Sequence, residues 1–235
     1  GYHLAQGNNE RPLTRLAVLP VAAKASVEQG LEAALESALA HWLYHDEIWL
    51  RGNAKAKAEI LLAIARVRHA LVLFGGIVPR KATTHLRALL NDADAVLLAA
   101  DTADEALFRT EVVAAKLALT EWLVQRGWRP FLNEAGEKKI AGSFKRFADI
   151  HLSRVAAELR SAVQHLAVED AADQLPKLSR DIDSVQLLAG AYGDAVAPWL
   201  ENWQELQRAI EHDDGSGLEY FRRQALAAEP FWLHS

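Results

Sequence analysis

The spacing of apolar residues is the feature that most constrains how this chain can fold. Between residues 54 and 74, apolar side chains recur at intervals of four, three, four and three residues, at Ile60, Ile64, Val67, Leu71 and Phe74. This period places all five side chains on one face of an α-helix. No segment of similar length alternates between apolar and polar residues, as a half-buried strand would. The spacing therefore predicts an all-α fold.

Helix-start signals and further apolar stripes extend this prediction along the chain. Ser26 followed by Gln29 is a capping box, which predicts a helix from about 26 to 49. Pro176 and Pro198 are typical of first helical turns. Besides these two segments, the patterns predict helices over about 82–99, 104–125, 144–166, 176–192, 198–211 and 218–228.

Glycine and proline residues gather between the two halves of this helical pattern. Gly127, Pro130, Gly136 and Gly142 interrupt the period and predict a connection near residues 130–145. We therefore expect two antiparallel bundles of long helices, at about 26–130 and 143–235. Residues 1–25 lack a helical period, and we interpret them as a linker from an upstream domain. The absence of methionine supports interpretation of the chain as a piece of a longer protein.

Composition excludes several classes of protein. The chain has 235 residues and no cysteine, which rules out disulfides, zinc–thiolate sites and cysteine nucleophiles. Its longest apolar run covers only residues 70–78, whereas a membrane span needs about 20 residues, so no membrane partner is expected. No secretory signal opens the sequence, and we expect a cytoplasmic protein. A net charge of −5 makes nucleic acid an unlikely partner.

Charge is unevenly distributed along the chain. Residues 51–87 carry eight basic side chains and one acidic side chain, whereas residues 169–235 carry five basic and thirteen acidic ones. A local basic concentration can attract polyanions even when the total charge is negative. Solvated helix faces and ion pairs across the bundle would explain the same distribution. Both interpretations stay open on the sequence alone.

No catalytic group, cofactor site or metal site is predicted from the residues. His41 and His45 lie one helical turn apart and could share a metal ion. However, Trp42 stands where a zinc-protease helix has its glutamate, and the sequence indicates no third ligand. We interpret the two histidines as lying near the C-terminus of a helix, where they offset its dipole. The seven tryptophans fall mostly on apolar stripes, which favours a role in the core.

The segment from Ala58 to Phe74 resembles the first signature helix of the CHAD family, the conserved-histidine α-helical domains. That signature reads approximately His-x-x-Arg-Val-x-x-Arg-Arg-Leu-Arg-x-x-Leu-x-x-Phe, and the match is best at Arg66-Val-Arg68 and Leu71-x-x-Phe74. Further along the chain, Asp92, Asp94 and Val96 match a second family segment, and the resemblance covers about residues 26–230. Residues 68–80 and 142–149 look most like the C-terminal domain of bacterial CYTH–CHAD inorganic triphosphatases.

This resemblance implies two helical bundles with a basic surface that binds polyphosphate. In the two-domain enzymes, triphosphate is cleaved by an upstream CYTH tunnel domain, which carries a Glu-x-Glu-x-Lys motif and uses Mg or Mn. That motif is absent from the present 235 residues. The resemblance therefore implies an accessory domain of an inorganic triphosphatase, with the CYTH domain as its partner in the same chain. Such a domain would not hydrolyse triphosphate by itself and would hold no cofactor of its own.

The basic face of the signature helices is largely lost in this chain. At the eight positions where the family has histidine, arginine or lysine, the sequence reads Ala58, Leu61, Ala65, Arg68, Pro176, Ser179, Asp183 and Gln186. We expect Arg66 to point away from this face, because each residue turns a helix by about 100°. Tight binding of phosphate needs converging arginine or lysine side chains, and a single arginine cannot supply them.

Any remaining phosphate binding would depend on basic residues outside those positions. The candidates are Lys57, Arg68, Arg80, Lys81, Arg87, Lys145 and Arg146. Three functions remain open: an accessory domain of a triphosphatase, an autonomous polyphosphate-binding module, and a helical bundle that binds other proteins without a small ligand.

Overall fold

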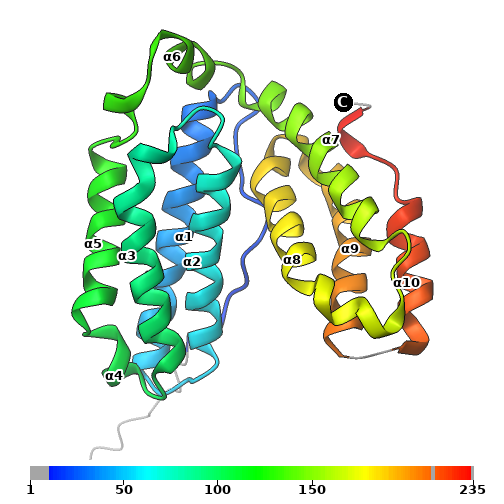
Figure 1. The fold of residues 1–235 in the computed structure, drawn as a ribbon, viewed down its shortest axis with the longest axis horizontal. Helices are drawn as coiled ribbons and strands as arrows, with labels where there is room; N and C mark the ends of the chain where they lie inside the picture. The colour runs from blue at the N-terminus through cyan, green and yellow to red at the C-terminus, as the bar shows by residue number, and fades with distance from the viewer. Residues whose placement is uncertain (1–10, 213–214, 234–235) are drawn as a thin grey trace, which may run out of the picture.

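The computed structural model describes residues 11–212 and 215–233, and helices dominate this part of the chain (Figure 1). The first group of helices comprises α1 (Val27–Leu50), α2 (Ala56–Leu73), α3 (Arg80–Ala99), α4 (Ala103–Leu107) and α5 (Thr110–Val124). The second group comprises α7 (Phe144–Val163), α8 (Ala171–Leu188), α9 (Val196–Glu211) and α10 (Gly215–Ala227). The short helix α6 (Glu134–Ile140) connects them, and the 3₁₀ turns are Arg129–Phe131, Val168–Asp170, Ala189–Ala195 and Phe231–Leu233.

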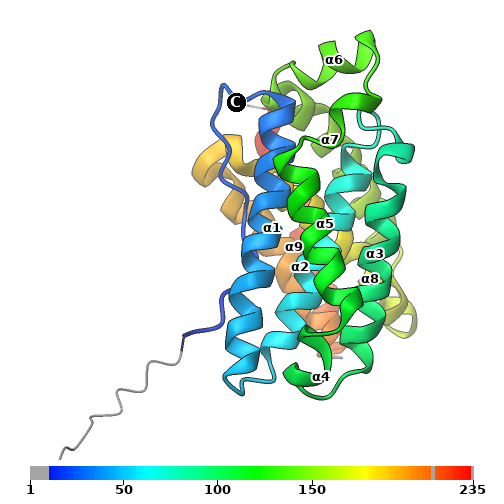
Figure 2. The same cartoon turned by 90° about the vertical axis from the view of Figure 1, so that its left-hand side faces the viewer.

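The two groups of helices form two bundles that lie side by side (Figure 1). In the first bundle, α1 packs against α2 and α3 packs against α5, and Figure 2 looks onto this bundle. In the second bundle, α8 packs against both α7 and α9, and α10 packs against α9. Contacts of α2 with α8 and of α1 with α7 join the bundles. The described residues contain no strand, so the prediction of an all-α fold is confirmed.

The predicted apolar stripes form the core. Ile60, Ile64 and Val67 of α2 are fully buried, and Leu71 and Phe74 are at most 2% exposed. The tryptophans behave as predicted, since six of the seven are buried in the core and the remaining one is half-buried. The capping box at the start of α1 is also confirmed, because the side chains of its serine and glutamine each bond to the other residue's backbone.

An extended segment, residues 11–25, runs between the bundles before α1 begins (Figure 1). Leu19 is 3% exposed, and its backbone N–H donates to the carbonyl oxygen of Gln186 on α8 at 2.9 Å. Gly190 permits this close approach, because a Cβ atom at that position would lie 1.7 Å from the carbonyl oxygen of Leu19. The segment is therefore packed against the helices of the second bundle.

The beginnings of the two bundles are tied together by backbone hydrogen bonds. The N–H of Val27 donates to the carbonyl of Gly142, and the N–H of Phe144 donates to the carbonyl of Ala25, each at 2.9 Å. These bonds form an isolated antiparallel bridge between the residues that cap α1 and α7. The first turns of both helices are thereby held at one end of the molecule.

Two predicted helix boundaries are wrong. The predicted helix over 104–125 is two helices, because Arg109 adopts an extended conformation with ψ of 142° between α4 and α5. Pro176 was expected in a first turn, but α8 begins earlier, at Ala171. Proline lacks the N–H that would reach the carbonyl four residues before it, so α8 tolerates the loss of one hydrogen bond near its start.

The interpretation of His41 and His45 as helix-terminal residues is also wrong. Helix α1 continues to Leu50, and no basic residue lies in its last turn. The dipole acts mainly within that last turn, so it does not explain the two histidines.

None of the helices within residues 11–212 and 215–233 is both long enough and apolar enough to span a bilayer.

Candidate functional site at the junction of the bundles

A groove of about 710 Å³ lies where α2, α8 and α9 meet, with residues 15 and 16 of the extended segment at its edge. Four of the eight positions at which the family has basic residues lie on α8, and all four line this groove: Pro176, Ser179, Asp183 and Gln186. Its charges balance, because it is lined by three arginines and three acidic residues: Arg15, Arg180, Arg208, Glu59, Asp183 and Glu211. The groove is therefore not a concentrated basic site.

The face of α2 that borders the groove differs from the predicted one. The other four of the eight positions lie on α2, at Ala58, Leu61, Ala65 and Arg68, and of these only Ala65 lines the groove. Ala58 is exposed outside it, while Arg68 is directed toward α3, where its Nη2 donates to the carbonyl of Leu90 at 3.0 Å. The lining residues of α2 include Leu62 and His69, so the groove-facing side is rotated by about one residue from the expectation.

Arg66 is the residue for which this rotation matters most: it does not line the groove, but it is directed toward α8 rather than toward α3 as Arg68 is. Its side chain is 1% exposed, and its Nε donates to Oδ1 of Asp183 at 2.7 Å. Its Nη1 donates to the carbonyl oxygen of Ala17 at 2.9 Å, and its Nη2 donates to the side-chain oxygen of Gln186. Arg66 thus connects α2 to α8 and to the extended segment.

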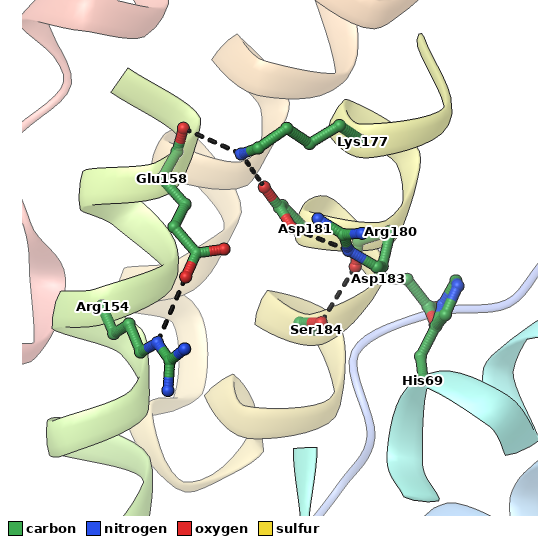
Figure 3. Close-up of polar contacts among 8 residues, drawn as sticks. All are labelled: His69, Arg154, Glu158, Lys177, Arg180, Asp181, Asp183 and Ser184. Atoms are coloured by element: carbon green, nitrogen blue, oxygen red, sulfur yellow. Dashed lines mark hydrogen bonds and ion pairs between the residues drawn. The ribbon is translucent and has the colours of Figure 1, made fainter. Parts of the chain in front are cut away.

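His69, one turn after Arg66, binds the same carboxylate. Its Nδ1 lies 2.7 Å from Oδ2 of Asp183, and Figure 3 shows the two side chains facing each other from α2 and α8. A carboxylate accepts paired hydrogen bonds from arginine much as a phosphate does. Asp183 is therefore the anionic partner of both Arg66 and His69, and it leaves neither of them without a carboxylate.

Other basic side chains near the groove also have carboxylate partners. Asp181, which is 3% exposed at its side chain, accepts from Nζ of Lys177 at 2.8 Å and from Nε of Arg180 at 3.2 Å (Figure 3). On α9, Nη2 of Arg208 lies 2.8 Å from Oε1 of Glu205. These pairs reduce the positive potential that the groove offers to an anion.

The structure places the seven predicted phosphate-binding residues outside the groove. Nζ of Lys57 donates to the carbonyl oxygens of Leu98 at 3.1 Å and Ala100 at 2.6 Å, and so caps the end of α3. Arg68 pairs with Asp94 at 3.4 Å between Nη1 and Oδ2. Both residues are engaged within the first bundle.

The other five candidates lie on α3 and α7. Arg80 and Arg87 lie about two turns apart on α3, and Nε of Arg87 donates to the hydroxyl of Thr83 at 2.9 Å. Burial and the charge of Arg80 lower the pKa of Arg87. Lys81 contacts the ring of Phe131. Lys145, on α7, lies 3.7 Å from Asp149 and 4.9 Å from the centre of the Tyr192 ring, and Arg146 is exposed nearby. The seven residues therefore do not converge on one place.

The basic segment 51–87 is offset by carboxylates from elsewhere in the chain. Arg51 pairs with Glu47, Arg66 with Asp183, and Arg68 with Asp94. These pairs agree with the interpretation that the charged residues form ion pairs across the bundle, although the sequence did not identify the individual partners. The best signal in the sequence for the contact with Asp183 is the spacing of Arg66 and His69, which places these two side chains one turn apart on the same helix.

Two antiparallel helical bundles, joined through facing signature helices, define a class of all-helical domains. The profile of the CHAD domain matches residues 33–216, and this chain belongs to the CHAD family. The crystal structure of the CHAD domain from the plant Ricinus communis is similar, with a TM-score of 0.58 and 16% sequence identity. The match covers 92% of this chain and 91% of that chain, so the likeness in fold extends over both bundles.

Proposed function

We propose that this CHAD domain is an accessory domain of an inorganic triphosphatase and that it does not act as an autonomous polyphosphate-binding module. The observation that carries the second part is the bonding of Asp183 to both Arg66 and His69, which gives the buried guanidinium of Arg66 a carboxylate partner beside the groove. The first part is supported by the resemblance of residues 68–80 and 142–149 to CYTH–CHAD triphosphatases.

In this proposal, a CYTH partner domain performs the chemistry and binds Mg or Mn. Magnesium prefers an octahedral shell of oxygen ligands, usually carboxylates, phosphates and water. Within the described residues, the one group of three or more potential metal ligands combines two histidines with a single glutamate. That group does not fit the implied magnesium centre, so no step of triphosphate cleavage is assigned to this chain. Its contribution is a rigid two-bundle scaffold beside the catalytic domain.

Triphosphate hydrolysis tests the assignment of catalysis. The present chain, incubated with triphosphate and Mg or Mn, is expected to release no phosphate above the background. Sustained release that tracks the purified chain would contradict the assignment. The reading frame that encodes the chain tests the association itself, since a CYTH domain with Glu-x-Glu-x-Lys is expected in the same protein. A full-length protein without such a domain would contradict the proposal.

Binding of long-chain polyphosphate distinguishes the autonomous-module alternative. Scattered, paired cations attract a polyanion mainly over long range, which salt screens over about 8 Å at physiological ionic strength. Calorimetry is therefore expected to show weak binding that disappears after a fivefold rise in salt. Tight binding that survives this rise would favour the alternative. If Arg180→Ala then removed it while Arg146→Ala did not, the binding site would be the groove.

A further inference from the structure

A third side chain joins the histidine pair on α1. Glu59, on α2, lies with its Oε2 3.0 Å from Nε2 of His41. One potential ligand atom from each of His41, His45 and Glu59 lies within 4.8 Å of the other two. The sequence indicated no third ligand because Glu59 is on a different helix, which only the packing of α2 against α1 brings close. Two helices thus present three convergent donors.

The hydrogen bonds of His45 leave one ring nitrogen suited to a metal ion. Its side chain is fully buried, and its Nδ1 lies 2.8 Å from the carbonyl oxygen of His41, which places the hydrogen on Nδ1. Nε2 then carries the lone pair, which accepts a hydrogen bond from the backbone N–H of Thr14 at 3.3 Å. Metal-bound histidines are commonly oriented by such a bond from the second nitrogen to a backbone carbonyl.

A positive charge near the cluster comes from Arg66, whose charge acts on His41. Arg66 would repel a cation, but Asp183 is bonded to it and offsets that charge. The carboxylate of Glu59, 3.0 Å from Nε2 of His41, is the acidic group of the cluster itself.

The donor set and its access indicate the kind of ion. Two imidazoles and one carboxylate are a ligand set that suits Zn²⁺, whereas Mg²⁺ and Ca²⁺ prefer oxygen alone. Glu59 lines the groove between the bundles, so one of the three ligands can be reached from solvent, whereas His45 is fully buried. The Thr14 bond lies beyond the usual range for an N–H donor, so an incoming ion displaces a weak contact.

We propose that His41, His45 and Glu59 form a Zn²⁺-binding site between α1 and α2, open to the groove. The ion would fasten α1 to α2 through side chains and would release Thr14 of the extended segment from His45. This inference is independent of the proposed function, because it does not involve triphosphate or a partner domain.

Zn²⁺ titration of the whole chain tests the proposal. We expect one tight equivalent by calorimetry, and strong visible absorption from a tetrahedral site when Co²⁺ replaces Zn²⁺. His41→Gln and Glu59→Gln should each weaken binding by more than about tenfold, since even the loss of an outer partner usually has that effect. His85→Gln is the control, because His85 is exposed on α3, away from the cluster. Circular dichroism verifies that each variant keeps its helices.

Thermal unfolding provides a second measurement. An ion that binds only the folded chain raises its stability, and a chelator removes that gain. We expect Zn²⁺ to raise the Tm of the wild type and of His85→Gln, but not of Glu59→Gln. Absence of tight binding in the wild type would overturn the proposal. So would tight binding retained by His41→Gln or Glu59→Gln, since it would place the ion on other histidines.

Discussion

Replacing Asp183 by asparagine should weaken the junction between the bundles more than the loss of one surface ion pair would. Asp183 accepts bonds from Arg66 and His69 of α2, and its side chain is 15% exposed. Asparagine keeps the size of the side chain but removes its charge. The guanidinium of Arg66, which is 1% exposed, would then be buried without a counter-ion.

The expected loss follows from that burial. Removing one partner of a buried ion pair lowers the free energy of unfolding by about 3 to 5 kcal/mol, whereas exposed pairs contribute about 0 to 1 kcal/mol. We expect a value near the lower limit, about 3 kcal/mol, because the asparagine oxygen can still accept one bond and other acceptors stay near Arg66. Those acceptors are the carbonyl of Ala17 and the side chain of Gln186.

A double-mutant cycle with Arg66→Met isolates the pair. Urea unfolding, followed by circular dichroism and tryptophan fluorescence, gives the free energy of unfolding of the wild type, both single variants and the double variant. The double variant should lose less than the sum of the single losses, by at least about 1.5 kcal/mol. A loss below about 1 kcal/mol in Asp183→Asn, or additive losses, would refute the argument that Asp183 neutralises a buried cation.

The same variant has a second measurable consequence. If Asp183 occupies the place of an external anion, its replacement frees Arg66 and His69 to bind one. Asp183→Asn should therefore bind polyphosphate more tightly than the wild type in the calorimetric titration. Unchanged affinity in a folded variant would show that the groove is closed to anions for a different reason.

Two further predictions concern stability. Gly190→Ala should displace Leu19, because the new Cβ would lie 1.7 Å from the carbonyl oxygen of Leu19. Proteolysis within residues 11–25 should therefore become faster. Gly76→Ala is the control and should leave the rate of proteolysis unchanged, because its Cβ meets no atom within 4 Å. Burial by itself would raise the pKa of Glu28, but hydrogen bonds from Arg129 and the adjacent tryptophan outweigh it and lower that pKa below 4.5. The carboxylate therefore stabilises the fold above pH 4.5 and loses this effect as the pH falls through the lowered pKa. Urea unfolding should show a larger difference between wild type and Glu28→Gln at pH 7 than at pH 3, and equal differences would contradict this assignment.

The sequence predicts the fold well because the fold depends on local periodicity. The stripe from Ile60 to Phe74 needs no knowledge of the partner helix, since its apolar face must be buried somewhere. The predicted start of α8 is too late, because Pro176 is a typical first-turn residue. The residues before it form helix as well, so α8 begins at Ala171. The break at Arg109 depends on backbone angles that leave little trace in the apolar pattern.

The candidate site is harder to predict because its contacts join distant parts of the chain. Arg66 and Asp183 are separated by 117 positions, and the choice between Arg66 and Arg68 depends on a small rotation of α2. His41 and His45 can be seen as a pair in the sequence, but Glu59 becomes their neighbour only through the packing of α1 against α2. Residue types alone therefore identify candidates without showing which ones meet.

The position of the extended segment sets an order of events during synthesis. Leu19 leaves the ribosome early, but its hydrogen-bond acceptor on α8 and the glycine that admits it follow about 170 residues later. At roughly 5 to 20 residues per second, the segment waits about 10 to 30 s for its binding surface. During this interval the first bundle can form with its inter-bundle face open to water and to chaperones. Closure of the junction is thus a late step in the biogenesis of the domain, completed only after α8 has been made.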